Sequence, residues 1–244
     1  TLHAVCYRVL GTGKELLAGN KADRQWLAES LQEDVDGKAS GLDQDFADPF
    51  VGNDTDAGKA LALWDVARNR LESYETAWRR VDAIDEHTPN FAICRSVVER
   101  YEQAKRLDHR CDFTDLLTRF AVWYSTIEGA EKCDPEGEAP DLPVWLFDES
   151  QDNSALIHSV CERLVQQPSV RYVYVAGDDA QAIYGFAGSD PRWFRDGWPF
   201  AKSRILSQSY RCPAQILDLG EGLLHECYDA KYYADRKVNG VHDD

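Results

Sequence analysis

Apolar residues recur at steps of three and four over most of the chain, a pattern that predicts amphipathic helices. The predicted helices cover residues 1–10, 22–35, 56–85, 91–107, 112–127, 154–166 and 214–224. Their predicted inward positions include Cys6, Val9, Trp26, Leu27, Leu31, Leu61, Trp64, Leu71, Tyr74, Trp78, Ile93, Val97, Val98, Tyr101 and Ala104. Residues 36–55 are rich in Asp, Gly and Pro and are expected to form a loop or short turns. The first half of the chain is therefore predicted to be mostly helical.

Two short apolar runs depart from the helical period, and each ends on a polar cluster. Residues 144–147, V-W-L-F, lead into Asp148 and Glu149, and residues 171–176, R-Y-V-Y-V-A, lead into G-D-D-A-Q. Because a predicted helix separates them, we expect parallel strands of one βαβ unit, the first of them buried. Ligands of open α/β sheets bind at the carboxyl ends of the strands, so both polar clusters are expected to face one site.

The composition is that of a soluble globular protein, with 43% hydrophobic and 29% charged residues. No apolar run approaches the roughly 20 residues that cross a bilayer, so no membrane span is predicted. The seven cysteines are odd in number and form no C-x-x-C pair, which favours reduced thiols and a cytoplasmic location. The net charge of −16 opposes general nucleic-acid binding, which would have to come from a local patch.

The two carboxylates that follow the first apolar run suggest phosphate chemistry. Magnesium prefers hard oxygen ligands, and a strand-end carboxylate such as Asp148 can hold it beside a bound phosphate. Glu149 is then the candidate general base, which would orient or deprotonate a water for attack on a terminal phosphate. A solvated strand end without chemistry remains the alternative for this pair alone.

The segment Gly11-Thr12-Gly13-Lys14 has some features of a phosphate-binding loop. However, Glu15 follows the lysine where that motif needs Ser or Thr, and a helix precedes it where the motif needs a strand. We therefore predict a helix-ending turn. The chain begins at Thr1 and contains no methionine, which we interpret as an internal fragment of a longer polypeptide.

Three ordered segments together resemble motifs II, III and IV of superfamily 1 DNA helicases of the UvrD/Rep/PcrA type. They are V-W-L-F-D-E-S-Q-D at 144–152, G-D-D-A-Q-A-I-Y-G-F-A-G at 177–188 and Q-S-Y-R-C-P at 208–213. Residues 1–8 look like motif Ib of the same family, and residues 112–117 are similar to the segment where its helical insert returns to the core. The resemblance is strong over 144–213 and weak over 22–110.

The resemblance implies an α/β fold with a RecA-like parallel sheet of the P-loop NTPase type, without the phosphate loop and with a large all-helical insert. Residues 1–20 would be part of the first RecA-like domain and residues 21–110 the insert. Residues 111–205 would complete the first domain, and residues 206–244 would begin a truncated second one. Since the phosphate loop would lie before Thr1, such a fragment alone is not expected to hydrolyse ATP.

The resemblance also assigns roles at an ATP site. It implies that Asp148 holds Mg²⁺, that Glu149 activates the hydrolytic water and that Gln181 contacts the γ-phosphate and reports its presence to the DNA side. Tyr210 would stack on adenine, and Arg211 would stabilise charge on the transferring phosphoryl group. Arg211 as a surface ion-pair partner is the simpler alternative. Gln151 and Asp152 are expected to hydrogen-bond to neighbouring loops.

On the DNA side, the resemblance implies that Tyr184 and Phe186 stack on bases of single-stranded DNA. Thr1 and His3 would touch the DNA backbone. The alternatives are core packing for the two aromatic residues and a plain helix-end role for His3.

Three positions depart from the family pattern. Ala187 stands where an arginine is usual, which removes a charged contact near both sites, and Phe186 replaces the commoner tryptophan. Ser209 replaces the usual asparagine before Tyr210. The first two changes suggest altered coupling between ATP and DNA.

The leading hypothesis is a fragment of an ATP-dependent 3′-to-5′ DNA helicase, acting in DNA repair or replication with ATP and Mg²⁺. It would couple ATP hydrolysis to movement on single-stranded DNA and to unwinding at duplex junctions, together with missing segments of the same polypeptide. One alternative is a degenerate ATPase-like module that acts through protein contacts, suggested by the acidic charge and Ala187. Another is a magnesium nuclease built on Asp148, Glu149 and Asp152.

Overall fold

The computed structural model describes residues 2–10, 15–31, 55–83, 88–124, 140, 142–227 and 238–240. Contacts divide the chain into two compact units, Thr1–Gly197 and Trp198–Asp244, which are described separately below. The predicted loop at 36–55 lies outside the described residues except for Thr55. The predicted domain boundaries at residues 20, 110 and 205 remain predictions.

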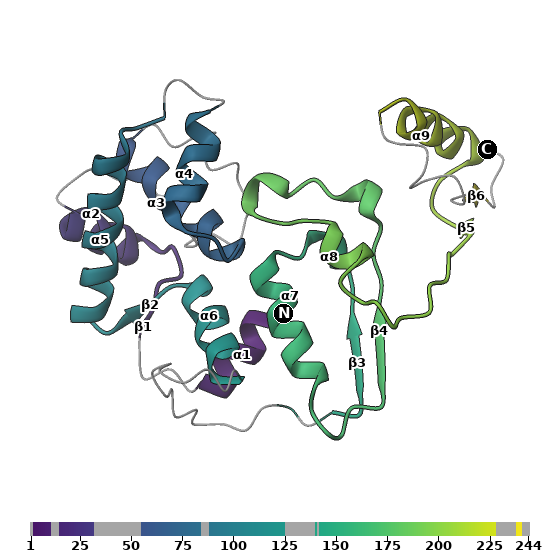
Figure 1. Ribbon diagram of the computed structural model, residues 1–244, viewed down its shortest axis with the longest axis horizontal. Helices are drawn as coiled ribbons and strands as arrows, with labels where there is room; N and C mark the ends of the chain where they lie inside the picture. The colour runs from purple at the N-terminus through teal and green to yellow at the C-terminus, as the bar shows by residue number, and fades with distance from the viewer. Residues whose placement is uncertain are drawn as a thin grey trace. The chain divides into compact units, whose positions relative to one another are not determined.

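The first unit alternates helices with short strands (Figure 1). Its elements are α1 (Leu2–Leu10), β1 (Glu15–Leu16), α2 (Lys21–Leu31), α3 (Asp56–Asn69), α4 (Tyr74–Asp82), α5 (Phe91–Leu107), β2 (Arg110–Cys111), α6 (Phe113–Tyr124), β3 (Val144–Phe147), η1 (Ser150–Asp152), α7 (Ala155–Val165), β4 (Tyr172–Val175), η2 (Asp179–Gln181), η3 (Gly185–Ala187) and α8 (Arg192–Arg195). The second unit contains β5 (Gln208–Ser209), α9 (Ala214–Cys227) and β6 (Asn239–Gly240), with β5 parallel to β6.

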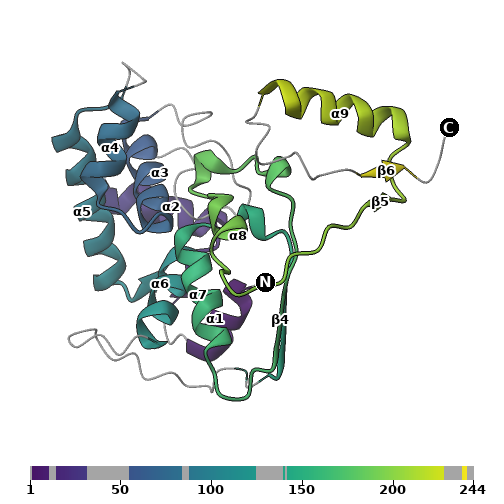
Figure 2. The same cartoon turned by 45° about the vertical axis from the view of Figure 1, so that its right-hand side comes forward.

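The predicted βαβ unit is confirmed. Strands β3 and β4 pair in parallel, with Val144 opposite Tyr172 and Phe147 opposite Val175. Helix α7 connects them and runs alongside the pair (Figures 1 and 2). Ser154 caps this helix, because its hydroxyl oxygen accepts a hydrogen bond from the Ile157 amide. The carboxyl ends of both strands therefore lie at one edge, as the sequence predicts.

The prediction that β3 is buried throughout is wrong for the described residues. Trp145 and Phe147 are buried and stack with ring centroids 6.0 Å apart, whereas the Leu146 residue is 76% exposed. Successive side chains of a strand point to opposite faces of its sheet, so an apolar run does not by itself bury both faces. The strand buries one face among the described residues.

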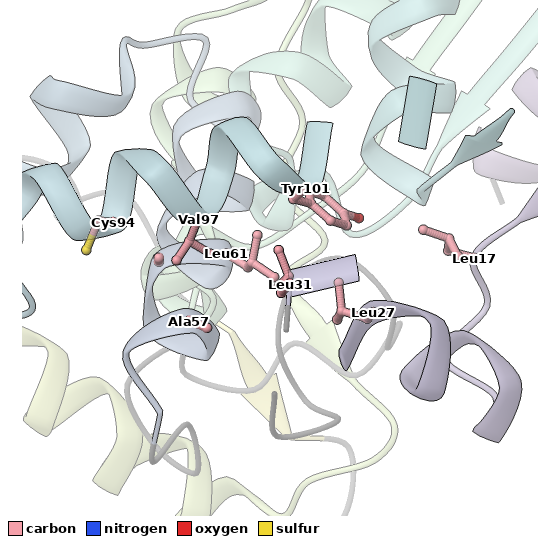
Figure 3. Close-up of a cluster of buried hydrophobic side chains, with 9 residues drawn as sticks. Leu17, Leu27, Leu31, Ala57, Leu61, Cys94, Val97 and Tyr101 are labelled. Atoms are coloured by element: carbon pink, nitrogen blue, oxygen red, sulfur yellow. The ribbon is translucent and has the colours of Figure 1, made fainter. Parts of the chain in front are cut away.

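Helices α2, α3 and α5 enclose a hydrophobic core of the first unit. The buried side chains are Leu17, Leu27, Leu31, Ala57, Ala60, Leu61, Cys94, Val97 and Tyr101, with Trp26, Trp64, Tyr74 and Trp78 packed against them. Figure 3 shows Leu31, Leu61 and Val97 pointing toward one another from these three helices. These aromatic side chains of the predicted helices thus pack between helices as part of the core.

The predicted single helix over 56–85 is two helices instead. Helix α3 ends at Asn69 and α4 begins at Tyr74, with Leu71 in the left-handed backbone region at φ 54°. The hydroxyl oxygen of Ser73 caps α4 by accepting a hydrogen bond from the Thr76 amide. Because the chain turns here, Leu71 is 59% exposed and does not continue the inward stripe. Ile93, also predicted to face inward, is exposed on α5.

A buried charge cluster joins α3, α5 and α6. It consists of Asp65, Arg68, Lys105, Asp112 and Asp115. Arg68 donates to Asp112 and Asp115 at 3.0 and 3.1 Å, and Lys105 donates to the same two carboxylates at 2.9 and 2.8 Å. Asp112 also accepts a hydrogen bond at 2.8 Å from the Asp115 amide, so its carboxylate caps α6. These ion pairs tie the helical core to α6.

The electrostatics of the cluster follow from burial and pairing. Burial by itself raises the pKa of the Asp112 carboxyl, but Arg68 and Lys105 outweigh it and hold that pKa well below its usual range. Glu102, Asp112 and Asp115 lie close enough to hold a cation. The Lys105 ammonium already contacts all three, at 2.9, 2.9 and 2.8 Å. The protein thus supplies its own cation at this position.

Within the segments that the structure describes, no helix has both the length and the apolar character needed to cross a membrane.

Candidate functional site

Asp148 and Glu149 lie at the carboxyl end of β3, and both are exposed. Glu149 is in the left-handed region, with φ 51° and ψ 39°, which turns the chain sharply out of the strand and into η1. The Glu149 amide donates a hydrogen bond to Asp148 Oδ1 at 3.0 Å. Two carboxylates are therefore presented to solvent from adjacent positions on an abrupt turn.

Gln151 connects this turn to the end of β4. Its side chain is buried. The amide nitrogen Nε2 donates to Glu149 Oε2 at 2.8 Å, and the oxygen Oε1 accepts from the Asp178 backbone N–H at 3.0 Å. This agrees with the sequence prediction that Gln151 hydrogen-bonds to neighbouring loops. One buried amide thus fixes the distance between the two polar clusters.

Gly177 makes this close approach possible. A Cβ atom at position 177 would lie 2.6 Å from Gln151 Oε1 and 3.2 Å from the backbone nitrogens of Ser150 and Gln151. The Ser150 amide also donates to the Ala176 carbonyl at 3.0 Å, so the two strand ends are joined through their backbones. Only glycine leaves room for Gln151 to reach Asp178.

Asp178 organises the segment that follows β4. Its carboxylate accepts hydrogen bonds from the Ala180 amide at 3.1 Å and from Gln181 Nε2 at 2.7 Å. Gln181 is exposed and is held in place by this second bond. The family resemblance implied a role for Gln181 and none for Asp178. The available signal was an Asp directly before a short turn, which is typical of a capping residue.

Asp152 is the last residue of η1, in the same turn. Burial, followed by the nearby Glu149 carboxylate, raises its pKa. Gln151 Nε2 lies 3.4 Å from Asp152 Oδ2.

We call Asp148, Glu149, Gln151, Asp178 and Gln181 the strand-end site.

Tyr184 and Phe186 lie on either side of Gly185. Their ring centroids are 6.1 Å apart with planes at 61°, and neither ring is buried. Gly188 ends the turn at φ 97°, in the region that glycine adopts freely. We call residues 184–189 the aromatic turn.

His3 on α1 packs edge to face against Phe113 on α6, with ring centroids 5.7 Å apart. Burial lowers the pKa of its imidazole, which favours the neutral form. Thr1, the other residue predicted to contact a DNA backbone, lies outside the described residues.

Tyr210 and Arg211 belong to the second unit and follow β5 directly. Both are exposed. The Tyr210 hydroxyl donates to Gln208 Oε1 at 3.0 Å, and Ser209 Oγ accepts from the amides of Arg211 and Cys212 at 3.4 and 3.1 Å. The serine at position 209 thus shapes the turn that presents both side chains. Within the first unit, the structure brings Asp148, Glu149 and Gln181 together through Gln151 and Asp178.

The strand-end site offers oxygen ligands of the kind that a magnesium–phosphate complex needs. Its exposed carboxylate oxygens are hard ligands of the kind that Mg²⁺ prefers. Its amides, in contrast, are occupied in hydrogen bonds to carboxylates and to backbone. Asp148 and Glu149 are therefore the groups best suited to contact a metal or a water molecule.

Comparison with known proteins identifies the family. A model of the UvrD/REP helicase N-terminal domain matches residues 1–197. A protein of Bacillus subtilis (strain 168) named "Putative ATP-dependent DNA helicase YjcD" is 24% identical over 231 residues. That similarity covers 89% of this chain and 26% of the relative, so the chain spans about a quarter of the relative's length. With most of its length matched by the family model, the chain belongs to the UvrD/REP helicase N-terminal domain family.

Proposed function

We propose that this chain is part of an ATP-dependent DNA helicase that couples ATP hydrolysis to movement on single-stranded DNA and to duplex unwinding. The observation that carries the proposal is the strand-end site, in which two exposed carboxylates after β3 are joined by buried Gln151 to the segment that holds Gln181. Family membership implies a RecA-like fold, in which such a strand edge faces the nucleotide.

Each residue of the strand-end site has a role in this proposal. Asp148 would hold Mg²⁺, which when bound neutralises charge on the phosphates. Glu149 orients the attacking water and accepts its proton. Gln181, fixed by Asp178, contacts the terminal phosphate. Because Gln151 bonds to both Glu149 and Asp178, a displacement of one cluster is transmitted to the other.

The second unit would contribute Tyr210 and Arg211 to the same reaction. Tyr210 stacks on adenine, and Arg211 donates hydrogen bonds to the phosphoryl group as its charge develops. The exposure of both side chains agrees with roles in ligand binding. Their assignment, like that of motifs Ib to IV, rests on the sequence resemblance.

The aromatic turn would form the DNA contact in the first unit. Tyr184 and Phe186 are exposed enough to stack on bases, a contact worth about 1 to 3 kcal/mol per base. Thr1 and His3 would touch the DNA backbone. A neutral His3 donates a hydrogen bond to phosphate without adding a full charge. In this proposal helices α2 to α5 correspond to the helical insert of the family. The protein is proposed to act in the cytoplasm.

The proposal is tested in the complete protein by Glu149→Gln. We expect DNA-stimulated ATP hydrolysis to fall by about 10² to 10⁴-fold, because removal of a general base has effects of that size. Binding of ATP should persist, and the melting temperature should match that of the wild type because Glu149 is exposed. Glu99→Gln, on the surface of α5, serves as the matched control and should retain wild-type rates.

Three outcomes would contradict the proposal. Hydrolysis within a few-fold of wild type for Glu149→Gln would remove Glu149 as the base. Absence of hydrolysis in the wild-type protein would favour an ATPase-like regulatory module, and metal-dependent DNA cleavage without ATP would favour a nuclease.

A further inference from the structure

The last turn of α3 contacts three separate parts of the first unit with three consecutive residues. Arg68 bonds to the carboxylates of the buried charge cluster. Asn69 accepts a hydrogen bond at 3.0 Å from the hydroxyl of Ser154, the residue that caps α7. Arg70 reaches the aromatic turn. A single helix end therefore links the helical core to both the α7 cap and the proposed DNA contact.

Arg70 bonds to the aromatic turn at its centre. Its Nη2 donates to the Gly185 carbonyl at 2.7 Å. The same oxygen accepts the Gly188 amide at 3.2 Å, which closes the turn of η3. The Arg70 guanidinium and the Gly188 amide thus donate to the same carbonyl oxygen. The bond from Arg70 is the stronger of the two because its donor is charged.

The other side of the aromatic turn is fixed by backbone contacts. Ser189 forms an antiparallel bridge with Ser154, and the Asp190 amide donates to the Asn153 carbonyl at 3.0 Å. Gly188 packs so closely on α3 that a Cβ atom there would lie 3.0 Å from Asn69 Cβ. Within the turn, the Tyr184 carbonyl accepts the amides of Ala187 and Ser189 at 2.9 and 3.3 Å. Arg70 adds a side-chain donor from another element to these backbone bonds, at the carbonyl between the two aromatic residues.

The side-chain position of Gly185 faces open space in the described structure, because a Cβ atom placed there would meet no atom within 4 Å. The two rings beside it are only partly covered. Without Arg70 this stretch of backbone would sample more conformations, and binding would have to supply the free energy that orders it.

We propose that Arg70 is a positioning residue for single-stranded DNA, which holds the Gly185 carbonyl so that Tyr184 and Phe186 keep the geometry needed to stack on bases. This inference rests on the proposed function. Arg70 acts through the turn and does not itself contact DNA. The helical core thereby sets the DNA affinity of a loop that lies 115 positions later in the sequence.

The test compares Arg70→Ala with Arg95→Ala in the complete protein. Arg95 is an exposed arginine of α5 that pairs with Glu99 at 2.8 Å, so its removal changes the net charge equally. We expect Arg70→Ala to raise the concentration of single-stranded DNA that gives half-maximal ATPase stimulation by about fivefold to tenfold, as the loss of one solvent-exposed hydrogen bond implies. The KM for ATP should stay within twofold, and Arg95→Ala should match the wild type.

The salt dependence of DNA binding separates positioning from direct contact. Loss of a phosphate contact lowers the slope of log affinity against log salt by about 0.7 for single strands. A positioning role predicts an unchanged slope, with weaker binding at every salt concentration. Arg70→Lys, which keeps one donor of similar reach, should recover most of the affinity.

A reduced slope in Arg70→Ala would overturn the positioning role, as would DNA affinity equal to that of Arg95→Ala. If Arg70→Ala lowers the melting temperature by more than a few degrees, Arg70→Gln, which retains a polar side chain, is measured in its place with the same expectations. Wild-type protein without DNA-stimulated hydrolysis would defeat the proposed function. Wild-type hydrolysis combined with no effect of Arg70→Ala would defeat only the role of Arg70. The two failures are therefore distinguishable.

Discussion

The buried charge cluster and the strand-end site are both rich in carboxylates, yet they use them differently. Asp112 and Asp115 each bond to Arg68 and Lys105 inside the helical core. Asp148 and Glu149 are exposed, and their hydrogen bonds come from a backbone amide and a glutamine. Acids that are neutralised by cations hold helices together, whereas acids without such a partner in the described structure are suited to bind a metal or a water.

This difference shows how the same side chain can serve structure or chemistry. Removing water from a carboxylate costs several kcal/mol and is repaid only by well-placed cations and hydrogen bonds. The cluster meets that requirement, so its members are committed to one arrangement. At the end of β3 the geometry comes from Gln151, Gly177 and backbone bonds, which leaves the carboxylates accessible.

The largest loss of stability is expected for Arg68→Met, which removes a cation from the buried charge cluster. It leaves the buried Asp112 and the partly buried Asp65 and Asp115 with Lys105 as their remaining cation. We expect the free energy of unfolding to fall by about 3 to 5 kcal/mol. Denaturant unfolding followed by tryptophan fluorescence measures the change. The control Arg95→Met removes an exposed i,i+4 pair and should cost about 0.3 to 0.5 kcal/mol. Equal losses for the two variants would show that burial of Arg68 is unimportant.

Gly177→Ala tests the strand-end site. The new methyl group would crowd Gln151, so we expect a loss of about 1 to 3 kcal/mol in unfolding free energy, typical of overpacking. Gly222→Ala is the matched control, since open space surrounds Gly222 in α9 and the same change should stabilise by about 0.4 to 1 kcal/mol. If both substitutions stabilise, the contact between Gly177 and Gln151 is not close in solution.

The smallest expected effect is a pH dependence from Asp112. Its pKa is lowered in the folded chain, so the unfolded chain binds more protons below its own value of about 4. The stabilisation is therefore complete above about pH 4 and declines as pH falls toward the folded pKa. At pH 3 the loss of stabilisation amounts to about 1 kcal/mol.

Comparison of wild type with Asp112→Asn between pH 3 and 6 isolates this term. The variant is less stable at pH 6, and the gap should narrow as the pH falls. A gap that is constant over this range would contradict the lowered pKa.

The sequence predicted the elements whose signals are local. Helix α5 begins and ends at the predicted residues, and the strands after Pro143 and Arg171 pair in parallel. Each depends on the apolar period or on the length of an apolar run within a few positions. The grouping of Glu149 with Gln181 at one edge also followed, because parallel strands bring their carboxyl ends together.

The features that were missed depend on distant residues. The stripe through Leu71 keeps its period across the turn, so the break between α3 and α4 left no apolar signal. Lys105 was not among the predicted inward positions, and its burial depends on Asp112 and Asp115, at the start of another helix. Arg70 and Gly185 are 115 positions apart and meet through a backbone carbonyl, which no side-chain pattern records.

The backbone at Glu149 has a consequence for the choice of amino acid there. At φ 51° and ψ 39° glycine would be the more comfortable residue, by roughly 1 kcal/mol. The Glu149 side chain is exposed, so burial in the hydrophobic core does not offset this strain. The chain thus keeps a strained residue at this turn, and the role proposed for the Glu149 carboxylate would account for it.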